Sequence, residues 1–438
     1  MKTKTFAEEK PDQLKELSAR LRKSLPSIEI YLAQLEKLFS EREPWVKAFL
    51  PEEYRFGRLR KDLFDLESQF PDKNSRPPLY GIPVGVKDIF HVKGFITRAG
   101  SRVPSEVIQG PEAKSVTMLK SAGALIMGKT VTTEFASFAP GVTCNPHNIN
   151  HTPGGSSSGS AAAVSAGLSP IALGTQTGAS ILRPASYCGV VGFKPSYGRI
   201  STEGVIPLAP SLDHVGFIAA DVEGAILVSS ILCEGWKDSI EIPKPVFGVP
   251  EGPYLGKAGK EGLQHFRKTC KRLSDDGFEI RSLEMLKDFD ELNKNNMALL
   301  AGEAALVHQE WFGRYSEYYR NETAEFIRKG QSIKPHDLSL YRANSVELRN
   351  EILKSMMENN ISALLTPGAS GPAPFGLQST GDPIMNMIWT YTGLPVVGIP
   401  SGKTEMGLPI GLQIVGSWWG DEFLLEIARQ VAKYISLF

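Results

Sequence analysis

Residues 152–167 read TPGGSSSGSAAAVSAG, a glycine- and serine-rich loop that runs into an alanine-rich segment. Flexible Gly/Ser linkers join domains and lie in polar sequence, but this loop lies within the longest span without a charged residue, between Glu134 and Arg183. The prolines and glycines of that span exclude a membrane helix, so we expect the span to be buried. Buried hydroxyl groups are costly unless they are hydrogen-bonded. Several serines together therefore indicate a polar network inside the protein.

Segments with strand-like and helix-like patterns alternate around this loop, which is typical of a wound α/β sheet. We expect two or three amphipathic helices within 7–75 and a mostly helical region at 255–360. The other expected elements are strands at 82–86, 124–127 and the segments ALLTP, LPVVGIP and PIGLQIVG, and helices at 112–123, 160–166 and 421–434. Since no repeat or long polar linker interrupts the chain, we predict one compact domain at 76–438, with an N-terminal helical segment, 1–75, packed on it.

Composition and charge exclude several classes of function. The 438 residues carry 48 basic and 48 acidic side chains, so no overall field attracts nucleic acid or an anionic membrane. The four cysteines lie 37 to 45 residues apart without a CxxC motif, which favours buried free thiols over a zinc site or a disulfide framework. The charged N-terminal sequence has no apolar signal-peptide region. We therefore expect a cytoplasmic protein that binds no metal or cofactor and contacts no membrane. A homodimer is compatible with the sequence.

Residues 123–130, GALIMGKT, match the phosphate-loop pattern G-x-x-x-x-G-K-[ST]. In a phosphate loop the glycine-rich turn lies between a strand and a helix. Here the four intervening residues are apolar and strand-like, a helix precedes them, and the TVTTEF that follows makes a poor first helical turn. We interpret the match as coincidental and Lys129 as a structural or surface lysine.

A second polar segment, GTQTGASILRPASYCG at 174–189, has the composition of an oxyanion site. Thr177, Gly178, Ala179 and Ser180 offer consecutive backbone N–H groups beside a hydroxyl, without a bulky side chain to block a substrate. A nucleophilic serine needs a base, and none of the seven histidines lies in a recognisable triad motif. A lysine with a pKa lowered by burial can take that role, and Lys87, at the end of an apolar strand, is the best-placed candidate.

These segments resemble the amidase signature family. The resemblance rests on GGSSSGSAAAVSAG followed by LGTQTGASILRPASYCGVVGFKPSYGRI, and extends to GIPVGVKDIF, GALIMGKTVTTEF, NPHNINHTPGG, APSLDHVG, LLTPGASGPAP and GLPVVGIPSGKTEMGLPIGLQIVG. Together they cover most of residues 75–435 in the family order. The resemblance implies a single large α/β domain with a central mixed sheet covered by helices on both faces. It also implies a hydrolase that cleaves carboxamide C–N bonds.

The family's catalytic triad of serine, cis-serine and lysine maps onto this chain position by position. The resemblance implies that Ser180 is the nucleophile, that Ser156 is the bridging serine preceded by a cis peptide bond, and that neutral Lys87 takes the Ser180 proton through Ser156. Backbone N–H groups within 177–180 would form the oxyanion hole. Ser157 and Ser158 are expected to support the loop.

The sequence departs from the commonest family form, GTDTGGSIRxPA, at three positions. Gln176 replaces an aspartate, Ala179 replaces a glycine, and the arginine falls one place later, at Arg183. Arg183 could bind a substrate carboxylate in a fork or anchor the loop, and we favour the structural role. Aromatic residues near Trp389 make that residue a candidate for substrate binding, although core packing explains them as well.

Two functions compete. The first is a stand-alone amidase that converts a small carboxamide to a carboxylate and ammonia or an amine. The alternative is the glutaminase A subunit of a tRNA-dependent amidotransferase, which would deliver ammonia to a partner protein. Two departures count against the alternative: that glutaminase holds glutamine with an arginine at the position of Leu182, and carries a small residue and asparagine where this chain has Trp389 and Thr390.

Overall fold

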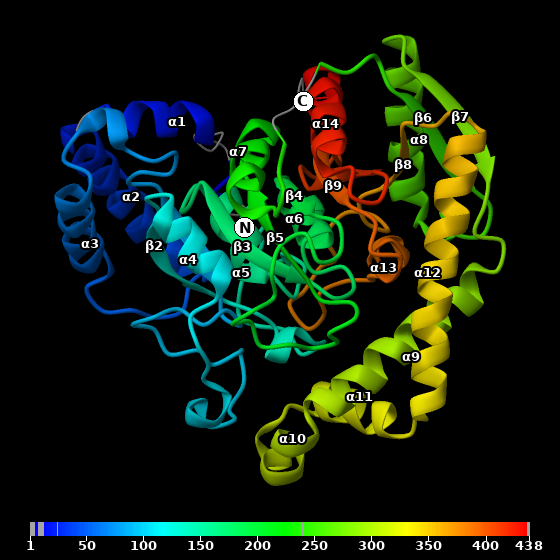
Figure 1. Cartoon of the computed structure of the whole chain (residues 1–438), viewed down its shortest axis with the longest axis horizontal. Coiled ribbons are helices and arrows are strands. Elements are labelled where there is room, and N and C mark those ends of the chain that lie inside the picture. The colour runs from blue at the N-terminus through cyan, green and yellow to red at the C-terminus, as the bar shows by residue number, and fades with distance from the viewer. Residues whose placement is uncertain (1–4, 8–12, 24, 238–240, 436–438) are drawn as a thin grey trace.

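Figure 1 shows the computed structural model of the chain, which describes residues 5–7, 13–23, 25–237 and 241–435. The parts of the predicted N-terminal segment at 1–4, 8–12 and 24 lie outside the described residues. The α-helices are α1 (Leu14–Leu21), α2 (Leu25–Val46), α3 (Arg55–Gln69), α4 (Lys114–Ser121), α5 (Ser158–Ser165), α6 (Leu182–Cys188), α7 (Val222–Leu232), α8 (Lys260–Asp275), α9 (Phe289–Val307), α10 (Gln309–Tyr315), α11 (Asn321–Gln331), α12 (Pro335–Glu358), α13 (Ile384–Tyr391) and α14 (Asp421–Ile435). The strands are β1 (Pro83–Lys87), β2 (Leu125–Thr130), β3 (Ile171–Gln176), β4 (Val191–Lys194), β5 (His214–Ala219), β6 (Val246–Glu251), β7 (Glu279–Glu284), β8 (Ala363–Pro367), β9 (Val396–Lys403) and β10 (Pro409–Val415). Short 3₁₀ helices include η3 (Glu134–Ala136) and η4 (Leu255–Lys257).

The described strands form one mixed sheet in the order β2-β1-β3-β5-β4-β9-β10-β8-β6-β7. At one end β1 pairs in parallel with both β2 and β3, and at the other end β6 pairs in parallel with β7 and β8. Antiparallel pairs join these ends through β5, β4, β9 and β10. The predicted α/β class with a central mixed sheet is therefore confirmed.

Helices cover both faces of the sheet because the side chains of a strand alternate between its faces. Ala172 of β3 and Ile218 of β5 pack with α5 and α6 in one apolar cluster. Their neighbours on the same strands, Leu173 and Phe217, belong to the main core with residues of α7. Helix α7 packs against α14 on this second face. Most of the uncharged span of the sequence is buried, as predicted, although parts of the loop 138–150 are exposed or half-buried.

The predicted elements are found with shifted ends. The helix expected at 112–123 begins at Lys114, and the strand expected at 124–127 continues to Thr130. Gly128, Lys129 and Thr130 are therefore inside β2, which excludes a phosphate loop at GALIMGKT. The region 255–360 is largely helical as expected, but it also contains the edge strand β7, whose residues are mostly polar, with Leu283 as its one buried residue, and gave no strand-like alternation.

Two groups of helices extend beyond the sheet (Figure 1). At the N-terminal end, α1 packs against α7 and α3 packs against β2, so the helical segment joins the same core. The division of the chain at residue 75 stays a prediction. Helices α9, α11 and α12 form a lobe on the other side, which contacts the sheet body through α13. Among the described residues, no helix is both long and apolar enough to span a bilayer.

Candidate active site

Three polar segments meet at the carboxyl ends of β1 and β3. The two strands are parallel neighbours, so their carboxyl ends lie at the same edge of the sheet. Lys87 is the last residue of β1, and Gln176 is the last residue of β3. The loop 177–181 leads from β3 into α6, and the loop 153–157 leads into α5, which packs on β3 and on α6. The fold therefore brings together segments that are far apart in the sequence.

Lys87 is completely buried and makes two hydrogen bonds. Its Nζ donates to Ser156 Oγ at 2.7 Å and to Thr175 Oγ1 at 2.8 Å. Burial holds the pKa of Lys87 well below its usual value, and the carboxylate of Asp213 opposes this shift only in part. The side-chain amine of Lys87 is thus suited to be neutral and to accept a proton.

The serine-rich loop is held in place by its own hydroxyl groups. The peptide bond between Gly155 and Ser156 is cis, as the resemblance implies. Ser157 Oγ donates to the carbonyl of Thr175 at 3.2 Å, and Ser158 Oγ donates to the carbonyl of Gly154 at 2.9 Å. These contacts agree with the supporting roles expected of Ser157 and Ser158.

Ser180 lies beside this loop. The backbone N–H of Ser157 donates to the carbonyl of Ser180 at 3.2 Å. The side chains of Ser156 and Ser180 line one small cavity of about 40 Å³. Its other lining residues are Ala136, Ser137, Phe138, Thr177, Gly178, Ala179, Arg183, Leu208, Leu300, Thr380, Pro383 and Met387. The structure thus brings all three predicted triad residues together, with Lys87 behind Ser156.

The loop predicted as the oxyanion hole is shaped by Gln176 and Thr390, both buried. Gln176 Oε1 accepts from the N–H groups of Ile181 and Leu182 at 2.9 and 3.0 Å, and its Nε2 donates to Thr390 Oγ1 at 2.9 Å. The Thr390 hydroxyl donates in turn to the carbonyl of Gly178. In the described part of the chain, the N–H groups of Gly178 and Ala179 have no acceptor, so they are available to an anionic oxygen.

Arg183 lines the small cavity, but its guanidinium contacts protein groups. It donates to the carbonyl of Gly381 at 2.7 Å, to the carbonyl of Gly155 at 2.8 Å and to Thr380 Oγ1 at 2.9 Å. These bonds connect the loop that carries Ser156 with the segment that precedes α13. The contacts agree with the structural role that the sequence favoured.

Trp389 lies in the core. It is fully buried, its indole N–H donates to the hydroxyl of Tyr254 at 2.9 Å, and the two rings meet edge to face. The residue belongs to neither the small cavity nor the larger cavity beside it. Core packing, which the sequence offered as the other explanation, accounts for this tryptophan.

Sequence reasoning did not single out Thr175, Asp213 or Thr390 as site residues. Asp213 is half-buried, and it accepts from Thr177 Oγ1 at 2.6 Å and from the N–H groups of Leu208 and Ala209 at 2.9 and 3.1 Å. Burial raises its pKa. The signal that could have found it is a lone acidic residue within the quoted segment APSLDHVG. Hydrogen bonds between residues that lie 36 to more than 200 positions apart in the chain cannot be predicted from a single sequence.

The described residues contain no group of three or more His, Cys, Asp or Glu side chains that could hold a metal ion. The polar groups that line the small cavity beside Ser180 are hydroxyl, guanidinium and backbone groups, with the amine of Lys87 behind Ser156.

Comparisons with known proteins identify the family. A family model described as Amidase matches residues 54–425. The A subunit of glutamyl-tRNA(Gln) amidotransferase from Geotalea daltonii is 31% identical over 94% of this chain and 95% of the relative, and the one from Koribacter versatilis is 32% identical over 81% and 84%. This chain belongs to the amidase signature family, and it is an enzyme that hydrolyses amide C–N bonds.

Solved structures agree with this assignment. A crystal structure of an amidase superposes with a TM-score of 0.86 at 30% identity, covering 96% of this chain and 98% of that one. The peptide amidase from Stenotrophomonas maltophilia has a TM-score of 0.81 at 23% identity over 97% of both chains, and it supports the fold alone.

Proposed function

We propose that this amidase hydrolyses a small carboxamide to a carboxylate and ammonia or an amine, through an acyl-enzyme on Ser180. The observation that carries the proposal is the hydrogen bond from the buried Lys87 amine to Ser156, in the loop that adjoins Ser180. A lysine in this environment favours its neutral form, and a neutral amine is the base that a serine nucleophile needs.

In the acylation step, Ser180 Oγ attacks the carbonyl carbon of the amide. Its proton passes to Ser156, while the proton of Ser156 passes to Lys87. The carbonyl oxygen becomes negative and accepts hydrogen bonds from the N–H groups of Thr177, Gly178 and Ala179. When the C–N bond breaks, the proton returns by the same route to the departing nitrogen. Ammonia or an amine leaves, and the acyl group stays on Ser180 as an ester.

In the deacylation step, Lys87 and Ser156 take a proton from water in the same way. The resulting hydroxide attacks the ester carbon, and the carboxylic acid and free Ser180 are formed. Arg183 positions the Ser156 loop in this scheme, because its donors are directed to Gly155, Thr380 and Gly381.

The replacement Ser180→Ala tests the nucleophile. We expect turnover of any accepted amide to fall by at least about 10³-fold, since covalent catalysis is lost, while the fold remains. Release of ammonia or amine measures the rate, and circular dichroism checks the fold. A fluorophosphonate should label the wild type at Ser180, located by mass spectrometry. Undiminished activity in the variant would remove this assignment.

The second candidate is the glutaminase A subunit of a tRNA-dependent amidotransferase. The relatives named above favour it, since both are A subunits of glutamyl-tRNA(Gln) amidotransferase. The site itself favours the first candidate. Leu182 stands at the position where the resemblance to that glutaminase implies an arginine that binds glutamine.

Ammonia release from a panel of amides distinguishes the two candidates. Hydrolysis by the protein alone supports the stand-alone amidase. Activity on glutamine that depends on added partner proteins supports the second candidate. Light scattering of the same purified protein measures its molar mass and so tests the prediction of a homodimer. Fractionation of cells tests the predicted cytoplasmic location.

A further inference from the structure

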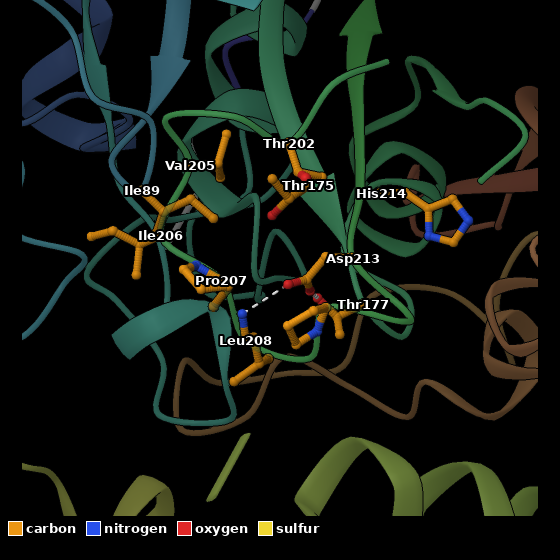
Figure 2. A pocket seen from close by; sticks show the side chains of 12 residues that line it. Ile89, Thr175, Thr177, Thr202, Val205, Ile206, Pro207, Leu208, Asp213 and His214 are labelled. Carbon is orange, nitrogen blue, oxygen red and sulfur yellow. Dashed lines mark hydrogen bonds between the residues drawn. The ribbon is translucent and has the colours of Figure 1, made fainter. Parts of the chain in front are cut away.

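A second and larger cavity adjoins the one that contains Ser180. Its volume is about 220 Å³, and it shares Ala136, Thr177 and Leu208 with the smaller cavity. Figure 2 shows that Thr175 and Thr177 face the segment 205–208 across it, with Asp213 beside them. Of these two cavities, the larger one is therefore separated from Ser180 by the residues that the two share.

This larger cavity lies on the lysine side of the site. Thr175 lines it, and the same hydroxyl accepts the hydrogen bond from Lys87. The proton that Lys87 returns through Ser156 goes to the nitrogen of the leaving group. Ser156 is hydrogen-bonded to Lys87, so we expect the substituent on that nitrogen to extend toward the lysine side. We expect the acyl part to extend toward Leu300 and Met387, which line the small cavity.

The size of the larger cavity exceeds what ammonia needs. A water-sized molecule occupies roughly 30 Å³ of liquid, so a cavity of about 220 Å³ has room for a group several times larger than ammonia. An enzyme restricted to primary amides would use only a small part of this space.

The lining defines the chemistry of the occupant. The apolar side chains on it are Ile89, Ala136, Val205, Ile206, Pro207, Leu208 and Pro210. Asp213 is its acidic residue, held by Thr177 and two backbone N–H groups. Burial lowers the pKa of His214 well below its usual value, so the histidine adds no positive charge at neutral pH.

We propose that this cavity receives the amine portion of N-substituted amides. The inference rests on the proposed function and names its substrate class: the amide nitrogen carries a compact, mainly apolar substituent, with room for one hydroxyl or amino donor facing Asp213. Cleavage forms the Ser180 ester, breaks the C–N bond and releases a primary amine, which takes the proton from Ser156. No further reactant besides water is needed.

The test compares each primary amide with the N-butyl amide of the same carboxylic acid. The release of that acid gives kcat/KM for both substrates. We expect the wild type to cleave the N-butyl amide within about tenfold of the primary amide. Half-buried Val205 lines the cavity, so Val205→Phe should lower the ratio of N-butyl to primary kcat/KM at least tenfold. Val205→Ala should raise the ratio of N-substituted to primary kcat/KM for N-substituents bulkier than butyl. This second variant keeps the test decisive if Val205→Phe does not fold.

Val346→Phe is the matched control, because Val346 is exposed on α12 and away from both cavities. It should leave the ratio at the wild-type value. Hydrolysis of primary amides alone, or an unchanged ratio in both Val205 variants, overturns this inference while the amidase mechanism stands. Hydrolysis of neither series, with Ser180 unlabelled by a fluorophosphonate, contradicts the proposed function as well.

Discussion

Lys87 shows how a single residue depends on its surroundings for its chemistry. In the sequence it is one of 48 basic residues, and in the structure it is a fully buried amine between two hydroxyl groups. Burial disfavours its charged form, because a charge loses the solvation of water, and this shifts the equilibrium toward the base.

The first prediction concerns the pH dependence of turnover. The neutral amine is the active form, so kcat/KM should fall as the pH decreases through the lowered pKa of Lys87, and should level off above it. In the Lys87→Ala variant, kcat/KM should be about 10² to 10⁴-fold lower than in the wild type, because this is the usual contribution of a general base. A pH–rate profile of both proteins checks this, and a full rate in Lys87→Ala would exclude the lysine as the base.

The same profile can be shifted through Asp213. The carboxylate of Asp213 raises the pKa of Lys87, although less than burial lowers it. Asp213→Asn keeps an acceptor for Thr177 but removes the charge, so the acidic limb should move to lower pH. A limb that stays in place would contradict the electrostatic link between the two residues.

A second prediction concerns Gln176 and Thr390, which hold the loop that carries Gly178. Thr390→Val keeps the shape and removes the hydroxyl, leaving the Gln176 amide and the Gly178 carbonyl without this partner. A buried polar group left unpaired costs about 1–3 kcal/mol. If about 1.4 kcal/mol of this is lost in the transition state, kcat/KM falls tenfold.

Thr392→Val is the control for Thr390→Val. Thr392 is equally buried on the same segment, but its hydroxyl bonds to carbonyls of α13 and does not touch the oxyanion loop. The control should keep a kcat/KM near that of the wild type. A double-mutant cycle with Gln176→Leu should give a coupling energy of about 0.5–3 kcal/mol, and strict additivity would show that the two residues act independently.

At the scale of elements, β1 and β2 are joined by more than their backbone ladder. Lys129 of β2 forms a buried ion pair with Asp88, the residue after β1, at 2.8 Å. It also donates to the carbonyl of Phe90 at 2.8 Å and to Thr97 Oγ1 at 3.0 Å. The lysine of the false phosphate-loop match is therefore structural, and it fixes the segment next to Lys87.

The third prediction is that Lys129→Met destabilises the protein by about 3–5 kcal/mol, because it leaves the buried carboxylate of Asp88 unpaired. Urea unfolding measures the change. Lys120→Met is the control: its partner Glu112 is 2.9 Å away and the lysine is more than a third exposed, so the loss should stay within about 1 kcal/mol. The double variant Asp88→Asn/Lys129→Met should recover part of the loss, and no recovery would argue against the ion pair as the cause.

At the scale of the whole molecule, Lys194 connects distant parts of the chain. It is completely buried at the end of β4, and its Nζ donates to the carbonyls of Pro195 at 3.2 Å and Leu394 at 2.6 Å. Burial lowers its pKa to about 7, while Asp421 opposes the shift. This lysine makes the stability of the fold depend on pH in the neutral to alkaline range.

The fourth prediction follows from that shift. Between about pH 7 and the usual lysine pKa of about 10.4, the unfolded chain keeps the Lys194 proton and the folded chain loses it. The contribution of Lys194 to the free energy of unfolding therefore rises with pH, by at most about 1.4 kcal/mol per unit. Lys194→Met should show a smaller slope than the wild type between pH 7.5 and 9 in urea unfolding. Equal slopes would contradict the lowered pKa.

The pattern of apolar residues determined which segments form strands and helices. Strands such as β1, β8, β9 and β10 were predicted because a buried strand needs apolar side chains wherever it meets the core. The edge strand β7 was missed because its exposed face is polar. Motif order also gave the candidate triad, since Lys87, Ser156 and Ser180 fall in segments that resemble the family.

Tertiary structure decided what the side chains do. Arg183, Trp389, Gln176 and Lys129 are ordinary polar or aromatic residues in the sequence, and their partners are up to 214 residues away. Hydrogen bonds, burial and cavities depend on atoms that the fold brings within a few ångströms, and no local pattern encodes those distances. The amino-acid sequence by itself determined the elements and the chemical groups, whereas packing of the sheet against its helices decided the basicity of Lys87 and the space beside Ser180.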